Sequence, residues 1–505
     1  MSRIIAALQS HAASNPRKVA LQDENSPLNY SDLLREISRL AQRLLDDPGG
    51  APRTIAIHSD NGIAWALADL AAHVAGIPIV PLPLFFSPSQ IDHVLNAAGI
   101  DQILSDQPER LSAALRQPGL SVEPFYGNLQ RVRLPSAVSR AALPEGTAKV
   151  TFTSGTTGEP KGVCLSREAM ETVAESLGSA SGASSSDRHL CLLPLATLLE
   201  NVGGIYAPLL AGATICIPRL AGVGLSGSSG LDIVGMLTAL GDWRASTAIM
   251  VPQMLQAMVA AGQAGISMPC RLRYLAVGGA PVSLQLLENA RTLGLPVYEG
   301  YGMSECASVV AVNRPGESRA GSVGKLLPHV RVEFADDGEI LIHGTRWHGY
   351  LGDRSPPQAG ESFATGDVGH VDSDGYLFLT GRKKNIFITS FGRNVAPEWV
   401  EGELLAQTGI AQAAIFGESR PFNSAVIVPH KGTTRAAIEA ALLKANHRLP
   451  DYAQVRAWIP ANEPFTPGNG MSTANGRLKR SEIQGKYAAQ IDALYQSELC
   501  KTGTL

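Results

Sequence analysis

The feature that most constrains the fold is a regular alternation of short β-rich runs and longer helical patterns from about residue 145 onward. Such alternation predicts parallel sheets covered by helices and joined by right-handed crossovers. The expected strands are Lys149–Phe152, His189–Leu193, Thr214–Pro218, Ala248–Val251, Arg273–Val277 and Pro296–Tyr298. The expected helices are Arg167–Leu177, Pro252–Ala261 and Ser283–Leu293, the last with Ser283 as its N-cap. The sequence therefore predicts an α/β fold.

The N-terminal part shows the same alternation of expected strands and helices. Asp32–Leu45 is an amphipathic helix, with Ser31 as the expected N-cap. Thr54–Ile57 is an expected strand, and Ile79–Val80 is a short strand bracketed by prolines. We expect these elements to belong to the same large domain, which then holds more than one parallel α/β sheet.

After Gly321 the pattern changes to short strands and tight turns. The expected strands are Val330–Phe334, Glu339–His343 and Gly375–Leu379, with hairpin-type turns at 336–338 and 372–375. Gly222–Gly230 is expected to be a flexible connector, with a substrate gate as the alternative. A last segment of about 120 residues is large enough for a small domain. We predict domains at residues 1–381 and 382–505, the first ending in a small β-rich subdomain.

Composition excludes several classes of protein. A net charge of −3 gives no general reason to bind nucleic acid or an anionic membrane. No segment approaches the ~20 uninterrupted apolar residues of a membrane span. The six cysteines stand at least 25 residues apart, so none has metal-ligand spacing. We expect buried free thiols and, from them, a cytoplasmic protein.

One loop has the composition of a phosphate site. Seven of the ten residues from Thr153 to Gly162 are Gly, Ser or Thr, and Lys161 stands near the end. Backbone N–H groups, hydroxyls and an ammonium in such a loop can converge on phosphate oxygens. It is not a Walker A loop, which needs Gly-Lys-Ser/Thr leading into a helix. A bland Ser/Thr/Gly surface loop is the alternative for this segment alone.

Four further landmarks follow in order along the chain. They are Tyr301-Gly302-Met303-Ser304-Glu305 after a predicted strand, Thr365-Gly366-Asp367 before a hairpin, Gly381-Arg382 at the end of that hairpin, and Asn475-Gly476-Arg477-Leu478-Lys479-Arg480. Ligands bind open α/β sheets at loops like the one that carries Ser304 and Glu305. Taken singly, Glu305 could be a helix N-terminal carboxylate, Asp367 a turn residue, and Arg382 and Lys384 solvated surface charge.

Together with the loop at 153–162, these landmarks resemble the adenylate-forming superfamily, which includes acyl-CoA synthetases, aryl-acid ligases, peptide-synthetase adenylation domains and firefly luciferase. The resemblance covers almost the whole chain. It implies a large adenylation domain and a mobile α+β C-terminal domain. It also implies that a carboxylate attacks the α-phosphate of ATP, expels pyrophosphate, and passes its acyl group to a thiol.

The resemblance assigns roles residue by residue. The β- and γ-phosphates would be held by Thr153, Ser154, Gly155, Thr156, Thr157, Gly158 and Lys161. Ser304 would contact the α-phosphate and Glu305 would ligate Mg²⁺. Asp367 would accept hydrogen bonds from the ribose, assisted by Arg382. The adenine site would comprise Gly279, Ala280, Pro281, Glu299, Gly300 and Tyr301.

The resemblance also assigns a second use to the C-terminal domain. Lys384 stands at the hinge position, and Gly392 lies in the loop that would line the pantetheine channel. The family normally has Gly-Lys in its C-terminal motif, where this chain has Gly476 followed by Arg477. In an extended segment Lys479 points to the same side as Arg477. We expect Lys479 to be the adenylation cation, with Arg477 as the alternative.

The segment Pro194–Glu200 bears on the acid. Thr197 stands where acyl-CoA synthetases often have an aromatic or His, and no Asp occurs between 189 and 217 to pair with a substrate amine. Apolar neighbours favour an acyl or aryl group, and Gly203-Gly204 could leave room for a chain.

We therefore expect an AMP-forming acid–thiol ligase that uses ATP, Mg²⁺ and CoA, with a fatty acid as first choice and an aryl acid as second. One alternative loads the phosphopantetheine of an acyl carrier protein. Another is a nucleotide-binding protein that has lost adenylation through Arg477. We expect a monomer or homodimer.

Overall fold

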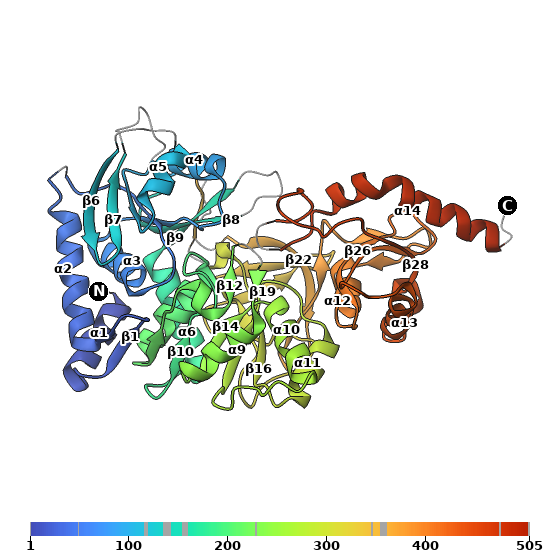
Figure 1. Cartoon of the computed structure of the whole chain (residues 1–505), viewed down its shortest axis with the longest axis horizontal. Coiled ribbons are helices and arrows are strands. Elements are labelled where there is room, and N and C mark those ends of the chain that lie inside the picture. Colours follow the sequence, from blue (N-terminus) through green and yellow to red (C-terminus); the bar gives the residue numbers. More distant parts are fainter. Residues whose placement is uncertain are drawn as a thin grey trace.

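The computed structural model describes residues 2–48, 50–115, 120–134, 143–153, 160–227, 230–344, 347–353, 361–473 and 476–502. Figure 1 shows an elongated molecule with the first helices at one end and the last helix, α14 (Arg480–Thr502), projecting at the other. Thr153 and Lys161 of the glycine-rich loop are described, whereas Ser154, Gly155, Thr156, Thr157 and Gly158 lie outside the described residues.

Two large mixed sheets form most of the molecule. Within the described residues the first has nine strands, in the order β18-β17-β16-β15-β14-β10-β11-β1-β2. In that order its strands are Lys325–Leu326, Ala311–Val312, Val297–Tyr301, Tyr274–Val277, Thr247–Met250, Arg188–Leu190, Thr214–Cys216, Val19–Gln22 and Pro27–Asn29. The six strands from β16 to β1 are parallel to one another, as the alternating sequence pattern predicts, and antiparallel strands finish both edges.

The second large sheet has eight described strands, in the order β21-β9-β8-β4-β3-β5-β7-β6. In that order they are Trp347–Tyr350, Lys161–Ser166, Thr147–Thr153, Ile79–Pro81, Ile55–His58, Gln102–Ser105, Leu129–Arg133 and Ser121–Tyr126. Its four central strands, from β8 to β5, are parallel. Strand β9 runs antiparallel to β8 and pairs Lys161 with Thr153, so the glycine-rich loop connects two antiparallel neighbours.

Helices cover both faces of both sheets. The buried strands carry apolar side chains on both faces, and each face needs a helix layer to shield it from water. Ile55 and Ile57 of β3 share one core with β1 and β11 of the other sheet and with α2 (Tyr30–Leu45), α3 (Ile63–Ala75) and α6 (Arg167–Ser181). Ala56, between those isoleucines, faces a separate core with α4 (Pro88–Ala97) and α5 (Pro108–Leu115). The outer face of the nine-stranded sheet packs on α9 (Ile233–Asp242), α10 (Pro252–Gln263) and α11 (Leu284–Thr292).

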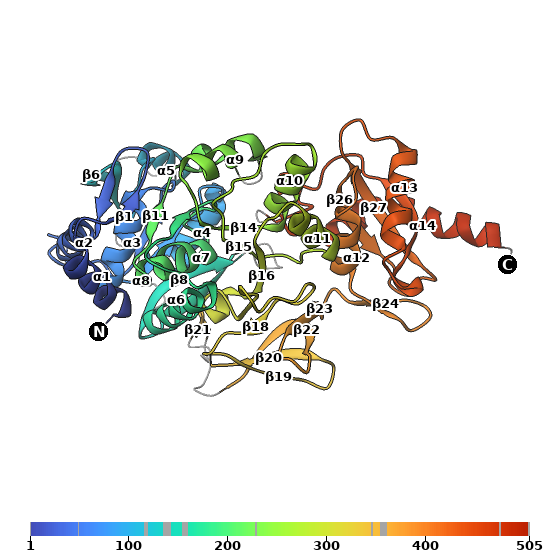
Figure 2. The same cartoon turned by 90° about the horizontal axis from the view of Figure 1, so that it is seen from below.

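A four-stranded antiparallel sheet follows, in the order β19-β20-β22-β23, with strands Arg331–Phe334, Glu339–His343, Phe363–Val371 and Leu377–Arg382. In the view of Figure 2 this sheet lies below the nine-stranded sheet. Its core includes Tyr301 at the end of β16, so the small sheet packs where that strand ends. Asp367 was expected before a hairpin, but it lies within the first strand of that hairpin, directly opposite Arg382.

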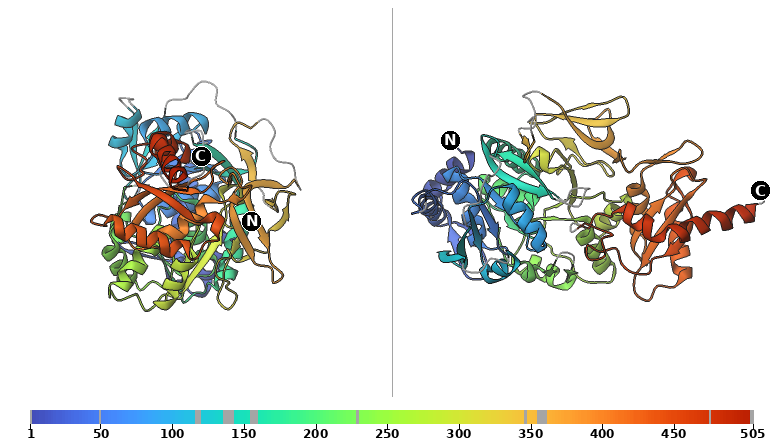
Figure 3. Two further views of the ribbon diagram at one scale, coloured as in Figure 1. Left: turned by 90° about the vertical axis from the view of Figure 1, so that its right-hand side faces the viewer. Right: turned by 90° about the horizontal axis from the view of Figure 1, so that it is seen from above.

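The C-terminal residues form a separate α+β unit. Its sheet is β26 (Ile410–Phe416), β27 (Asn423–Pro429) and β28 (Val455–Pro460), covered on one face by α12 (Pro397–Leu405) and α13 (Arg435–Asn446) and on the other by α14. The hairpin β24 (Phe387–Ile388) and β25 (Asn394–Val395) precedes it. The view from above in Figure 3 shows this unit beside the large domain. Arg448 joins the two: its guanidinium lies 3.2 Å from Glu288 Oε2 and donates to Gln285 of α11.

Several local expectations need correction. The N-cap of α2 is Asn29, whose side-chain oxygen accepts from the Asp32 N–H at 2.8 Å, and not Ser31. Segment 222–230 is not a plain loop, because a 3₁₀ turn (Leu220–Val223) leads into the short paired strands Leu225–Ser226 and Gly230–Leu231. Cys270 is exposed, while Cys164, Cys191, Cys216 and Cys306 are buried. Among the described helices, none is both long and apolar enough to cross a bilayer.

Candidate active site

The best-defined group in the site is centred on the Asp367 carboxylate. Arg382 faces it across the β22–β23 pair, with 2.6 Å between Arg382 Nε and Asp367 Oδ1. The Tyr301 hydroxyl donates to Asp367 Oδ2 at 2.6 Å. Asp367 is buried, which raises the pKa of its carboxyl, while Arg382 and the Tyr301 hydrogen bond counteract that rise. The cross-strand register and the buried tyrosine therefore fix a carboxylate at one place and in one orientation.

The loops at the carboxyl ends of β15 and β16 lie next to this group, since Val277 and Glu299 are partners in the parallel pair. Gly279 has φ +88°, a conformation that favours glycine, and it is exposed together with Ala280 and Pro281. A Cβ on Gly278 would lie 3.3 Å from the Gly300 carbonyl oxygen, so small residues permit this close approach. The six residues assigned to the adenine site thus gather at one edge of the nine-stranded sheet.

Glu299 is the buried acid of that edge. Burial raises the pKa of its carboxyl to about 8, and a hydrogen bond from the Val282 N–H opposes the rise. Because Val282 follows Pro281, the carboxyl ties the exposed loop 279–281 to β16. A carboxyl that holds its proton near neutral pH can also donate a hydrogen bond.

Ser304 and Glu305 lie in a 3₁₀ turn (Ser304–Cys306) directly after β16, at the edge where the sequence predicts them. The Tyr350 hydroxyl donates to Glu305 Oε1 at 2.8 Å. The ammonium of Lys161 lies over the Tyr350 ring, 5.5 Å from its centre. Tyr350 therefore connects the end of the glycine-rich loop with the acidic turn. Sequence reasoning missed it, because no motif surrounds it and the β21–β9 pairing alone brings it here.

The glycine-rich loop keeps its predicted relation to the sheet at both described ends. Thr153 ends β8, and Lys161 begins β9, a strand where a Walker A loop would have a helix. His93 contacts the Pro160 carbonyl oxygen through Nε2 at 3.1 Å, which fixes the chain just before β9 begins.

The C-terminal unit brings a second set of cations to Asp367. Partial shielding from water lowers the pKa of Arg477, and the charge of Arg382 lowers it further, whereas Asp367 and Glu398 oppose that shift. Lys384 experiences the same surroundings: shielding, Arg477 and Arg382 lower its pKa, and Glu398 raises it. Arg382 and Arg477 thus both act on the Asp367 carboxylate, and Lys384 is close enough to the two arginines to be affected by their charge. Positive charge gathered in this way is suited to an anionic ligand.

The position of Lys479 follows from local pairing. The Thr473 N–H donates to the Arg477 carbonyl, the Lys479 N–H donates to the Met471 carbonyl, and Ser472 is bridged to Leu478. Leu478 packs on the core under α14, so its neighbours Arg477 and Lys479 both point away from that core. Within the described residues no hydrogen bond or ion pair engages the Lys479 ammonium.

Gly392 is apart from this cluster. It lies in the exposed turn of the β24–β25 hairpin with φ +69°, next to Phe391, which is 75% exposed. The Ser390 N–H donates to the Arg420 carbonyl of the same unit. The hairpin presents an apolar side chain and a glycine to solvent.

In the segment Pro194–Glu200, which we expect to bear on the acid, Thr197 is exposed and is the N-cap of α7 (Leu198–Glu200). The interpretation of Gly203-Gly204 as room for a chain is wrong. A Cβ on Gly203 would lie 2.8 Å from Ile249 Cδ1, and one on Gly204 would lie 2.2 Å from Glu200 Oε1. Both glycines therefore allow close packing within the protein.

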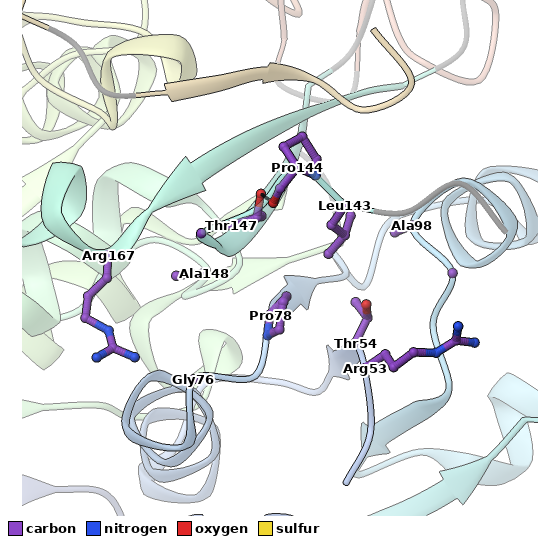
Figure 4. Close-up of a pocket in the computed structure, with 12 residues that line it drawn as sticks. Arg53, Thr54, Gly76, Pro78, Ala98, Leu143, Pro144, Thr147, Ala148 and Arg167 are labelled. Atoms are coloured by element: carbon purple, nitrogen blue, oxygen red, sulfur yellow. Dashed lines mark hydrogen bonds between the residues drawn. The ribbon is translucent and has the colours of Figure 1, made fainter. Parts of the chain in front are cut away.

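A cavity of about 620 Å³ lies elsewhere (Figure 4). It opens at the amino ends of β3, β4 and β8, where Thr54, Pro78 and Thr147 line it. The nucleotide-site candidates occupy the carboxyl ends of strands, so this cavity is separate from them.

Comparison with known proteins accounts for this arrangement. The sequence model of the AMP-binding enzyme family matches residues 8–354, and that of the AMP-binding enzyme C-terminal domain matches residues 384–499. The long-chain-fatty-acid–CoA ligase FadD15 of Mycobacterium bovis is 27% identical, covering 88% of each chain. The 2-succinylbenzoate–CoA ligase of Bacillus licheniformis is 27% identical and covers 81% of this chain and 86% of that protein.

Solved structures agree on the fold. An anthranilate CoA ligase in complex with anthranoyl-AMP superposes with a TM-score of 0.80 at 19% identity, covering 96% of this chain and 97% of the other. An o-succinylbenzoate CoA synthetase from Bacillus subtilis, in complex with ATP and magnesium ion, gives 0.74 at 23% identity, covering 95% and 99%. The mixed α/β architecture with a large N-terminal part and a C-terminal unit is that of these enzymes.

Proposed function

Because the chain belongs to the AMP-binding enzyme family, we propose that it is an ATP-dependent acid–thiol ligase that makes an acyl-AMP and then a thioester of CoA. The observation that carries this proposal is the group Tyr301–Asp367–Arg382, with Arg477 of the C-terminal unit beside it. The group combines a fixed buried carboxylate with cations from two domains.

The proposed first step joins two anions. A carboxylate oxygen of the acid bonds to the α-phosphorus of ATP, and the bond from that phosphorus to the pyrophosphate oxygen breaks. Fixed positive charge lowers the barrier because it acts where negative charge accumulates. Arg382, Lys384 and Arg477 would supply part of that charge, and the loop 153–158 with Lys161 would hold the β- and γ-phosphates. Ser304 would contact the α-phosphate.

The acidic turn fits a magnesium ion. Glu305 offers hard carboxylate oxygens of the kind Mg²⁺ prefers, and the Tyr350 hydroxyl, donating to Oε1, orients them. Bound there, the ion would offset charge on the phosphates. In the same proposal Asp367 accepts from the ribose hydroxyls with Arg382 beside it, and the loop 279–281 with Glu299, Gly300 and Tyr301 receives the adenine.

We propose that Lys479 is the cation that meets the acid's carboxylate, with Arg477 on the ribose side. Two facts support this division: Asp367 affects the pKa of Arg477, and Lys479 points the same way two residues further along. In the second step the C-terminal unit would turn about Lys384 and bring Gly392 to the thiol arm. The exposed Gly392 hairpin is free to make such contacts.

For the acid, we propose a fatty acid first and an aryl acid second. The relatives named above include ligases of both kinds. CoA is the proposed acceptor, and the phosphopantetheine of an acyl carrier protein is the alternative. A nucleotide-binding protein without adenylation is a second candidate, favoured by one observation, the Arg477 that replaces the usual lysine. The buried cysteines fit a cytoplasmic location.

A panel of fatty, aryl and amino acids tests the proposal. Each acid is incubated with ATP and Mg²⁺, and pyrophosphate and AMP are measured. The measurement is made with CoA, with an acyl carrier protein that bears a free phosphopantetheine thiol, and with neither. Pyrophosphate released with an apolar acid and CoA-dependent thioester formation are the expected results. ATP binding without release of pyrophosphate in the presence of any acid would establish the nucleotide-binding alternative instead.

A further inference from the structure

The helix that follows Thr197 contains an unusual turn. Between α7 and α8 (Ala207–Leu210), residues Asn201–Tyr206 form a π-helical turn, and the Ala207 N–H donates to the Val202 carbonyl, five residues back. π turns are rare, occur mostly as single turns within α-helices, and are frequent at functional sites. Some feature outside the helix must favour this turn over a regular α-helix.

That feature is a buried ion pair. Asp69 of α3 and Lys149 of β8 are 0% and 1% exposed, with 2.7 Å between Lys149 Nζ and Asp69 Oδ1. Asp69 Oδ2 accepts from Asn201 Nδ2 at 3.0 Å and from the Tyr206 hydroxyl at 2.6 Å. The Lys149 ammonium in turn donates to the Tyr206 hydroxyl at 3.1 Å and to the Asn201 side-chain oxygen. Both ends of the π turn therefore bind the same two charges.

The geometry of these contacts selects the π turn. In an α-helix of 3.6 residues per turn, side chains five residues apart lie about 140° apart around the axis. They could not both reach one carboxylate. A turn closed by i→i+5 hydrogen bonds brings them to nearly the same face. Asp69 and Lys149 thus stabilise the π turn specifically.

A second polar group fixes the start of the same helix. Glu200 Oε1 lies 3.0 Å from His189 Nε2, and Glu200 Oε2 accepts from the Leu193 N–H. His189 also contacts Thr247 Oγ1 through Nδ1 at 3.0 Å. His189, Cys191 and Glu200 lie close enough together to ligate a metal ion. The hydrogen bonds within the group account for the histidine and the carboxylate, so we assign it a structural role.

The fixed helix adjoins the candidate site. The Leu199 side chain would be 3.8 Å from a Cβ on Gly278, the residue that leads into the exposed loop 279–281. Asn61 holds the approach to the helix, since it donates to the Leu193 carbonyl and accepts from the Leu195 N–H. Thr197, exposed between these buried contacts, begins the helix. The position of the stretch from Thr197 to Leu199 therefore depends on the π turn behind it.

We propose that Asp69 and Lys149 are positioning residues for the acid: they hold the π turn and, through it, the wall formed by residues 197–199 that the bound acid meets. The inference rests on the proposed function for its substrate. A buried ion pair is a weak source of stability, because desolvation offsets its attraction, but it can specify one geometry. Here the geometry specified is the wall of the acid site.

The test uses the full chain and two graded variants. Tyr206→Phe removes the two hydrogen bonds that the hydroxyl makes with Asp69 and Lys149, and Asp69→Asn removes the carboxylate charge. Asp187→Asn is the control, since Asp187 is also buried and paired with an arginine, Arg273, but has no contact with the π turn among the described residues. In pyrophosphate exchange we expect Asp69→Asn to raise KM for the preferred acid at least ~10-fold, with KM for ATP within ~2-fold of the wild type.

Tyr206→Phe should show a smaller rise in the same direction, and Asp187→Asn should leave KM for the acid unchanged at a similar loss of Tm. Equal effects of Asp69→Asn and Asp187→Asn on the acid, or an effect on ATP alone, would overturn the proposal. Hydrogen exchange supplies a readout independent of activity. Amides 202–207 should exchange faster in Asp69→Asn than in Asp187→Asn.

The two proposals fail in different ways. If no acid supports pyrophosphate exchange by the wild-type chain, the proposed function is refuted. Hydrogen exchange of amides 202–207 then decides whether the Asp69–Lys149 pair holds the π turn. An active wild type with unchanged acid KM and unchanged amide exchange in Asp69→Asn refutes the positioning role alone.

Discussion

The Tyr350 hydroxyl donates to the Glu305 carboxylate at 2.8 Å, while the Lys161 ammonium lies over the same ring. One aromatic side chain on β21 thus orders the acidic turn after β16 and the lysine that ends the glycine-rich loop. Its contribution can be measured without altering either charged residue.

Tyr350→Phe keeps the ring beneath Lys161 and removes only the hydrogen bond. A hydrogen bond to a charged group contributes about 1.5–3 kcal/mol, so the Mg²⁺–ATP-dependent kcat/KM should fall roughly 10- to 100-fold. Pyrophosphate exchange at varied Mg²⁺ measures this, and the apparent Mg²⁺ requirement should rise. Tyr376→Phe, at a tyrosine whose ring lies near Arg319 and Lys325, is the control. Wild-type activity in Tyr350→Phe would remove Tyr350 from the site.

Arg382→Lys tests whether the Asp367 partner acts through geometry as well as charge. Arg382 reaches Asp367 through Nε and the Thr365 carbonyl through Nη1, and a lysine cannot reproduce that fork. We expect KM for ATP to rise about 10-fold with little change in KM for the acid. Arg319→Lys, at an arginine that pairs with Asp372 and Asp374 instead, should leave both constants unchanged. An identical rise in both KM values would indicate general distortion of the site.

Glu299 should make stability depend on pH. Its folded-state pKa of about 8 exceeds the ordinary 4.5, so between these values the folded state keeps a proton that the unfolded state has lost. Stability contributed by this group is therefore full below about pH 4.5 and is lost progressively up to about pH 8. Each pKa unit corresponds to about 1.4 kcal/mol, so the effect amounts to several kcal/mol.

Glu299→Gln removes this titration while keeping the shape of the side chain. The difference in Tm between Glu299→Gln and the wild type should shift in favour of the variant from pH 5 to pH 8 and then stay constant. Thermal denaturation across that range measures it. Glu401, whose pKa burial raises to about 7, is present in both proteins and cancels in the difference. A pH-independent difference would contradict the assignment.

Much of the fold could be predicted because buried strands leave a local signal. Glu339–His343 has the predicted bounds, since a run of three apolar β-prone residues follows an Asp-Gly turn there. Caps are less certain when two candidates stand close together. Asn29 and Ser31 are both good N-caps, and Tyr30 packs in the core, so the helix begins two residues earlier than expected.

The parts of the site that depend on distant pairing could not be predicted. Tyr350 reaches Glu305 because β21 pairs with β9, and no local pattern encodes that register. Asp69 and Lys149 lie in elements made mostly of apolar residues, and no sequence motif marks them as partners. A π turn differs from an α-helix by a single residue in its hydrogen-bond register, which the sequence does not reveal. The room expected at Gly203-Gly204 is filled by Ile249 and Glu200, which sequence spacing does not reveal.

The two cations of the C-terminal motif, Lys479 and Arg477, should have separable effects. Lys479→Ala should slow acyl-AMP formation by about 10²-fold or more, the scale for loss of one donor to a transition state, and leave ATP binding nearly intact. Arg477→Ala should mainly raise KM for ATP, because its charge acts beside Asp367 and Arg382. Single-turnover pyrophosphate release and ATP titration measure the two effects separately. Thioester formation from added acyl-AMP and CoA is the control, since it bypasses the first step and should survive Lys479→Ala. If Arg477→Ala shows the large loss in rate and Lys479→Ala shows none, the roles are reversed; if neither slows adenylation, the cation lies outside this motif.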